Sequence, residues 1–108
     1  SSDVCSSDLT KLRHMCSQLN YDLFRISLVD DPSCDCGNIC ENAYHYIFDC
    51  TLYKFQRRKL FDNITNVTLC RVPLDIDLVL NGSADLSNHE NEIIFQHVHN
   101  YIRETNRF

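Results

Sequence analysis

The sequence has very little glycine or proline and contains no long apolar run. Only two Gly and two Pro occur among 108 residues, and 44% of the residues are hydrophobic, a composition that argues against intrinsic disorder. No run of about 18 apolar residues is present, so no transmembrane helix and no membrane partner are predicted. The composition favours a small, soluble and mainly α fold.

Local signatures of the common enzyme classes are also missing. The sequence contains no Gly-rich phosphate loop, no nucleophile elbow and no acidic pair set between hydrophobic strands as in a polymerase palm. The dipeptide Tyr21-Asp22 stands outside any such context. We therefore expect no catalytic residue, no enzymatic activity and no small-molecule substrate.

A surplus of basic charge is absent as well. Ten Lys and Arg against fifteen Asp and Glu give a net charge of −5, whereas autonomous nucleic-acid binders are usually strongly basic. Four of the ten basic residues nevertheless lie between Lys54 and Lys59. On a helix Lys54, Arg57, Arg58 and Phe61 share one face, which suits phosphates and unstacked bases. The same pattern also fits a solvent-exposed face opposite a core face.

The pattern with the most specific chemistry is C-x-C-G-x8-H-x4-C, formed by Cys34, Cys36, Gly37, His45 and Cys50. Three thiolates and one imidazole complete a tetrahedral set for zinc, which predicts a closed structural Zn²⁺ site with these four ligands. Gly37 allows the positive φ that a tight turn between ligands requires. The segment 41–50 is predicted to form a short helix with residues 44, 47 and 48 on its apolar side and Cys50 near its end.

Three alternatives accompany the zinc interpretation, and one of them is that the cysteines are unrelated buried thiols. Seven cysteines and three N-glycosylation sequons, at Asn63, Asn66 and Asn81, would also suit a disulfide-linked secreted protein. A Cys-x-Cys pair is awkward to bridge, and disulfides leave the histidine unexplained. Within the zinc interpretation, Cys36 and Cys40 form a competing C-x3-C pair, so Cys40 is an alternative ligand.

The remaining sequence predicts further helices. Apolar residues recur at helical spacing from Thr10 to Leu28, with Cys16 as a core thiol and Ile26 on the apolar stripe. The segment 67–82 fits a short helix or a strand, of which we favour the helix. A capping box at Ser87-Asn-His-Glu90 opens an amphipathic helix whose apolar residues are Ile94, Phe95, Val98, Tyr101 and Ile102. His97 and His99 lie two residues apart and cannot bind one ion from a helix.

Residues 1–9 differ in character from the rest. They contain Ser-Ser-Asp twice, and Cys5 to Leu9 matches the translation of a sequencing-adapter string. We expect this leader to be non-native and the chain to be a fragment; a flexible Ser/Asp-rich leader is the alternative. The expected organisation is therefore a leader (1–9), a helical zinc module (10–66), a connector (67–84) and a C-terminal amphipathic helix (85–108).

The cysteine motif belongs to a longer spaced series of residues. The series comprises Pro32-x-Cys34-x-Cys36-Gly37, Glu41-x-x-x-His45, Cys50-x-Leu52-Tyr53, Arg57-x-x-Leu60, Leu86-Ser87-x-x-Glu90-Asn91, Ile94-Phe95 and Thr105-x-Arg107-Phe108. It resembles the region C-terminal to the reverse transcriptase in polyproteins of non-LTR, LINE-type retrotransposons. Thr51 departs from the proline common in that family after the last cysteine.

The resemblance implies a role. It makes Cys34, Cys36, His45 and Cys50 the zinc ligands of a CCHC module that helps the polyprotein to hold template RNA or target DNA, and it implies an intracellular location in cytoplasm and nucleus. Nucleic acid would then contact Lys54, Arg57, Arg58 and Phe61, with Tyr53 as a further candidate. The alternative is a structural module that docks on the upstream reverse transcriptase domain without touching nucleic acid.

Overall fold

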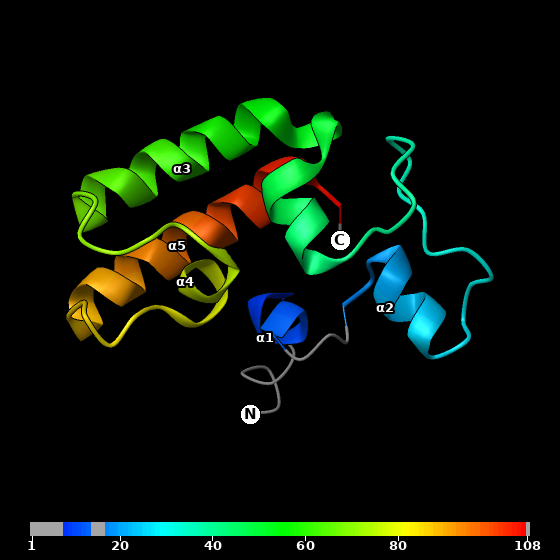
Figure 1. The fold of residues 1–108 in the computed structure, drawn as a ribbon, viewed down its shortest axis with the longest axis horizontal. Helices are drawn as coiled ribbons and strands as arrows, with labels where there is room; N and C mark the ends of the chain where they lie inside the picture. The colour runs from blue at the N-terminus through cyan, green and yellow to red at the C-terminus, as the bar shows by residue number, and fades with distance from the viewer. Residues whose placement is uncertain (1–7, 14–16, 108) are drawn as a thin grey trace. The chain divides into compact units, whose positions relative to one another are not determined.

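The computed structural model describes residues 8–13 and 17–107 (Figure 1). Over these residues the chain forms helices and helical turns and no strand, which confirms the mainly α fold. It divides into two compact units, residues 1–54 and 55–108. The elements are α1 (Asp8–Arg13), α2 (Asn20–Arg25), the π-helical turn η2 (His45–Asp49), the 3₁₀ turn η3 (Thr51–Tyr53), α3 (Lys54–Thr68), α4 (Ile76–Asn81) and α5 (Asn88–Thr105).

The first unit has a small core built by short helices and turns. Its buried apolar side chains are Leu9, Leu12, Leu19, Tyr46 and Ile47. Leu9 belongs to α1, although it falls within the leader that the sequence suggested to be non-native. Residues 1–7 of that leader lie outside the described residues, as does the proposed core thiol Cys16.

Helix α2 ends earlier than the apolar spacing indicated. Its last turn closes with two backbone hydrogen bonds, from Ser27 to Phe24 and from Leu28 to Leu23, while Ser27 adopts a φ of +62°. This is a Schellman ending, in which a residue with positive φ stops the helix. Ile26 is therefore not part of the core, because the chain turns there and leaves its side chain 60% exposed.

The predicted helix before Cys50 is present, but its turn is wider than an α-turn. The amide of Cys50 donates to the carbonyl of His45 at 2.8 Å, five residues back, and this spacing defines a π-turn. The wider turn buries Tyr46 and Ile47 and leaves Tyr44 half exposed, so the expected apolar side of this helix is wrong at residue 44. Tyr44 instead stacks on Phe48 with ring centroids 5.1 Å apart.

The second unit is built by α3, α4 and α5. Each helix buries one face, and the buried apolar side chains are Leu60, Ile64, Leu78, Val79, Leu80, Ile94, Val98, Tyr101 and Ile102. The capping box at the start of α5 is confirmed: Ser87 Oγ accepts from the Glu90 amide, and Glu90 accepts from the Ser87 amide. The segment 67–82 contains a helix, α4, which resolves its ambiguous alternation in favour of the helical interpretation.

A polar clasp joins α4 to α5. Gly82 follows α4 with a φ of +75°, a conformation that side-chain-bearing residues rarely adopt. The Asn91 side chain on α5 then accepts from the Ser83 amide and donates to the Ser83 carbonyl, both at 3.0 Å. The two helices are thereby held in contact, as Figure 1 shows by the proximity of the α4 and α5 ribbons.

Candidate metal centre

The four residues of the cysteine–histidine motif converge in the first unit. Their ligand atoms, three Sγ atoms and one imidazole nitrogen, all lie within 4.8 Å of one another. Cys34, His45 and Cys50 are buried, whereas Cys36 is half-buried. Four soft or borderline donors in one small volume can hold a metal ion such as zinc.

Two of the separations between these atoms are close to those around a tetrahedral ion. With Zn–S bonds of about 2.3 Å and Zn–N bonds of about 2.0–2.1 Å, the edges of a tetrahedron are about 3.8 Å between sulfurs and about 3.6 Å between sulfur and nitrogen. The Sγ atoms of Cys34 and Cys50 lie 3.6 Å apart, and Cys36 Sγ lies 3.3 Å from His45 Nε2. A disulfide would need about 2.05 Å, and none of the five described cysteines, Cys34, Cys36, Cys40, Cys50 and Cys70, forms a disulfide.

A tight turn presents the first two thiols. The Gly37 amide donates to the Cys34 carbonyl at 2.9 Å, and the Cys34 amide donates to the Asn38 carbonyl at 2.8 Å. Gly37 has a φ of +99°, as the spacing predicted for a glycine next to two ligands. The turn therefore aims Cys34 and Cys36 from one short loop.

Turn η2 presents the other two donors. The His45 amide is held by the Asn42 side chain at 2.8 Å, which anchors the start of the turn. The hydrogen bond of the π-turn, from the Cys50 amide to the His45 carbonyl, then holds Cys50 close to His45. Because a π-turn spans five residues, His45 and Cys50 lie one turn apart and can face a common centre.

A buried carboxylate, that of Glu41, lies beside the cluster, and the cysteine–histidine spacing predicts no role for it. Glu41 is 3% exposed; its Oε1 accepts from the Asn20 amide at 2.8 Å, and its Oε2 lies 3.7 Å from Cys34 Sγ. The Glu41 backbone also accepts from the Tyr21 amide at 3.0 Å. Glu41 thus ties the start of α2 to the metal-site loop, and its position four residues before His45 is its only sequence signal.

The thiols of the cluster differ in acidity. Burial raises the pKa of Cys34 to about 12. Burial also acts to raise the pKa of Cys36, but the Asn38 amide and the neighbouring thiols Cys34 and Cys50 lower it overall. Burial raises the pKa of Cys50. A bound dication reverses this preference, because its charge stabilises coordinating thiolates.

Cys40 and the C-terminal histidines lie outside the cluster. Cys40 is half-buried, and burial, with the nearby Asp22 carboxylate, raises its pKa. Among the described residues the ligand cluster contains Cys34, Cys36, His45 and Cys50, and it includes neither Cys40 nor the pair His97 and His99.

The predicted cationic face lies on α3, and its residues divide between two environments. Lys54 and Arg58 are exposed, whereas Arg57 and Phe61 are half-buried at the edge of the face that carries Leu60. Tyr53 is also half-buried and packs edge-on against Tyr46, with centroids 5.5 Å apart. The predicted contacts are therefore not equally available on the helix surface.

The most exposed aromatic residue on α3 is Phe55, which is not among the contacts predicted from the sequence. Phe55 is 79% exposed, and it lies among Lys54, Arg58 and Lys59 in the sequence. Lys59 is engaged by Glu104 on α5 at 2.8 Å. The spacing of cations alone pointed to Phe61, since the position of the core face was not yet known.

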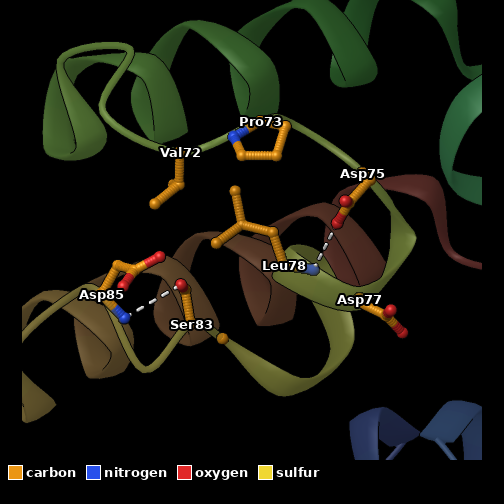
Figure 2. Close-up of a pocket in the computed structure, with 8 residues that line it drawn as sticks. Val72, Pro73, Asp75, Asp77, Leu78, Ser83 and Asp85 are labelled. Carbon is orange, nitrogen blue, oxygen red and sulfur yellow. Dashed lines mark hydrogen bonds between the residues drawn. The ribbon is translucent and has the colours of Figure 1, made fainter.

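A pocket of about 220 Å³ lies in the second unit beside α4 (Figure 2). Figure 2 shows the Leu78 side chain pointing toward Val72 and Pro73, with Asp75, Asp77 and Asp85 around it. The Asp75 carboxylate accepts from the Leu78 amide at 2.9 Å, and the Asp85 amide donates to Ser83 Oγ at 3.1 Å. These bonds fix local backbone turns, and none of the predicted site residues lines the pocket.

Comparison with known proteins finds no matching family model, no matching curated protein and no matching solved structure. Within the described residues, no helix is long and apolar enough to cross a membrane. The resemblance to LINE-type polyproteins therefore stays a prediction from the motifs, while the ligand cluster stands on the geometry.

Proposed function

We propose that this chain is a non-catalytic, zinc-stabilised module from the C-terminal region of a LINE-type reverse transcriptase. In this role it acts inside the cell and helps its parent polyprotein to hold template RNA or target DNA. The observation that carries the proposal is the Cys34, Cys36, His45 and Cys50 cluster, which has the ligand order of the family motif and is followed at once by a cationic helix.

The metal serves structure in this proposal. Three sulfurs and one nitrogen fill all four coordination positions of a tetrahedral zinc ion, so no position is left open for a reacting water. The ligands come from two separate segments, the turn at Cys34 and Cys36 and the turn η2 with Cys50 at its end. Zinc would therefore fix the relative position of the turn and η2.

Nucleic acid would bind locally, on the surface of α3. The stretch 51–61 contains four basic residues and no acidic residue, although the whole chain is acidic. Lys54 and Arg58 project from α3 into solvent, where each can neutralise one phosphate and release its counterions. Arg57, half-buried, is the weaker candidate on this helix.

A salt titration tests this proposal. Binding of the zinc-loaded chain to labelled RNA should weaken linearly as log salt rises, and the double variant Lys54→Ala, Arg58→Ala should reduce that slope by about two. Arg103→Ala is the matched control, because Arg103 is an exposed arginine on α5, and it should leave the slope unchanged. Equal slopes for the two variants would overturn the assignment to α3.

The alternative role is docking on the polymerase domain, and exposed apolar side chains in the first unit favour it. Ile26, Leu28 and Ile39 are 60%, 69% and 83% exposed, and the chain carries a net charge of −5. If docking is the function, the double variant Leu28→Ser, Ile39→Ser should lose co-purification with the polymerase domain, while the wild-type chain shows no salt-dependent affinity for RNA or DNA.

A further inference from the structure

Phe55 occupies an unusual place for a large aromatic residue. Its side chain is 79% exposed on the second residue of α3. Within α3 it is also the one large apolar side chain that is exposed, since Leu60 and Ile64 are buried. Residues three and four positions apart share a helix face, so Arg58 and Lys59 lie on the same side as Phe55, and Lys54 precedes it directly.

We infer that Phe55 is a base-stacking residue that gives this module a preference for single-stranded over double-stranded nucleic acid. The inference rests on the proposed function, because it names the class of nucleic acid that the α3 surface would take. An exposed ring flanked by cations can stack on an unpaired base while the cations contact neighbouring phosphates. In a duplex both faces of each base are already covered by its neighbours.

The local charge favours this occupant over a protein or a lipid surface. The cores of protein interfaces are depleted in lysine, yet Lys54 directly precedes the ring, and the sequence from Thr51 to Phe61 contains no acidic residue. Lys59, on the same side, is paired with Glu104 of α5, so Lys54 and Arg58 supply the charge beside the ring. Membrane-surface helices need a continuous apolar stripe, whereas the exposed face of α3 offers a single aromatic ring. A flexible polyanion with accessible bases complements both features.

A single substitution can report stacking directly, because the chain contains no tryptophan. In Phe55→Trp the new indole is the only one in the protein, and stacking on a base quenches its fluorescence. The probes are an oligouridine of about 12 nucleotides, within the site sizes of single-strand binders, and a blunt-ended RNA duplex without a loop and with the same number of phosphates. We expect strong quenching and retained affinity with the oligouridine, and little quenching with the duplex.

The matched variants measure the size of the effect. Phe55→Ala should weaken oligouridine binding by roughly 5- to 150-fold, the range given by base–aromatic stacking, and should change duplex binding by less than about twofold. Leu69→Trp is the control for quenching, because Leu69 is 71% exposed just after α3 and lies away from the cationic run. Its fluorescence should not change with either probe.

The possible outcomes separate this inference from the proposed function. If Lys54→Ala, Arg58→Ala loses affinity while Phe55→Ala does not, the α3 surface binds phosphates and the stacking role is wrong. If Phe55→Ala instead abolishes self-association or binding to the polymerase domain without affecting oligouridine, the ring serves a protein contact. If the wild-type chain binds neither probe, the proposed function fails and this inference fails with it.

Discussion

At the scale of single residues, Cys36 and Cys40 provide a test of the ligand set. Both are half-buried thiols in the same loop, but only Cys36 belongs to the cluster. Cys36→Ser should weaken zinc binding by more than about 100-fold, beyond the usual effect of losing an outer-shell partner, whereas Cys40→Ser should retain the metal. Zinc analysis and the visible absorption of the Co²⁺-loaded protein measure this. Equal loss in both variants would contradict the four-residue site.

A second prediction at this scale concerns Glu41, whose buried carboxylate accepts a hydrogen bond from the Asn20 amide at 2.8 Å. Glu41→Ala leaves the half-buried Asn20 amide without its acceptor and should lower the free energy of unfolding by about 1 kcal/mol. Glu41→Gln keeps an oxygen in place and should cost clearly less. Denaturant unfolding of the zinc-loaded chain measures both values, and a similar cost for the two variants would show that the acceptor role is unimportant.

At the scale of elements, the two glycines differ in what surrounds them. Both have positive φ, but a Cβ at Gly82 would lie 2.7 Å from Asn91 Oδ1 and 3.1 Å from Phe95 Cζ, whereas a Cβ at Gly37 would meet nothing within 4 Å. Gly37→Ala should therefore cost only backbone strain, about 1 kcal/mol. Gly82→Ala adds disruption of the α4–α5 clasp and should cost more, about 2–3 kcal/mol. Thermal unfolding of both variants tests this order.

The start of α5 should make stability sensitive to acid. The Ser87 amide and Arg71 hold the pKa of Glu90 below its ordinary value of 4.5. A carboxyl group with a lowered folded-state pKa contributes stability above its unfolded pKa, and this contribution is lost as the pH falls through the folded-state value. Glu90→Gln keeps a capping-box side chain but cannot titrate, so its melting temperature should fall less than that of the wild type below about pH 4.5. If the melting temperatures of the wild type and Glu90→Gln fell equally with pH, this prediction would be wrong.

Elements defined by local spacing were predictable from the sequence. The capping box at Ser87, the turn at Gly37 and the convergence of Cys34 with Cys50 all depend on a few residues near each other in the chain, so spacing alone contains them. The end of α2 could not be predicted from the sequence. The residue with positive φ that ends the helix is Ser27, and serine rarely indicates that conformation.

Features that depend on how a helix faces its core were harder to predict. On α3 the core face is set by Leu60 and Ile64, and this leaves Phe55 outside and Phe61 at the edge of the core. The cation spacing alone pointed to Phe61. In the same way, the contact between Glu41 and Asn20 joins residues that are 21 positions apart, and no local pattern reveals such a pairing.

At the scale of the whole molecule, most of the net negative charge belongs to the residues that precede α3. Residues 1–54 contain four basic and eight acidic residues, while residues 55–108 contain six and seven. A zinc ion with three thiolates would add one further negative charge to the first unit. Nucleic acid should therefore approach through α3, because the first unit repels phosphates.

The same division predicts how the molecule responds to metal removal. All four candidate ligands belong to residues 1–54, and structural zinc supplies about 10–16 kcal/mol of apparent binding energy in finger-like peptides, as much as the stability of a whole domain. The second unit has its own buried residues on three helices and its own capping box. Chelation should therefore unfold the first unit and leave α3 to α5 folded.

Hydrogen exchange resolves this prediction residue by residue. The Tyr46 and Cys50 amides donate hydrogen bonds to the carbonyls of Asn42 and His45. After chelation these two amides should lose their protection from exchange, whereas amides in the middle of α5 should keep it. Cys36→Ser without chelator should reproduce the same pattern, since it removes a ligand and nothing from the second unit. Loss of protection in both units at once would mean that the chain folds as one cooperative body, and unchanged protection in the first unit would mean that metal does not stabilise it.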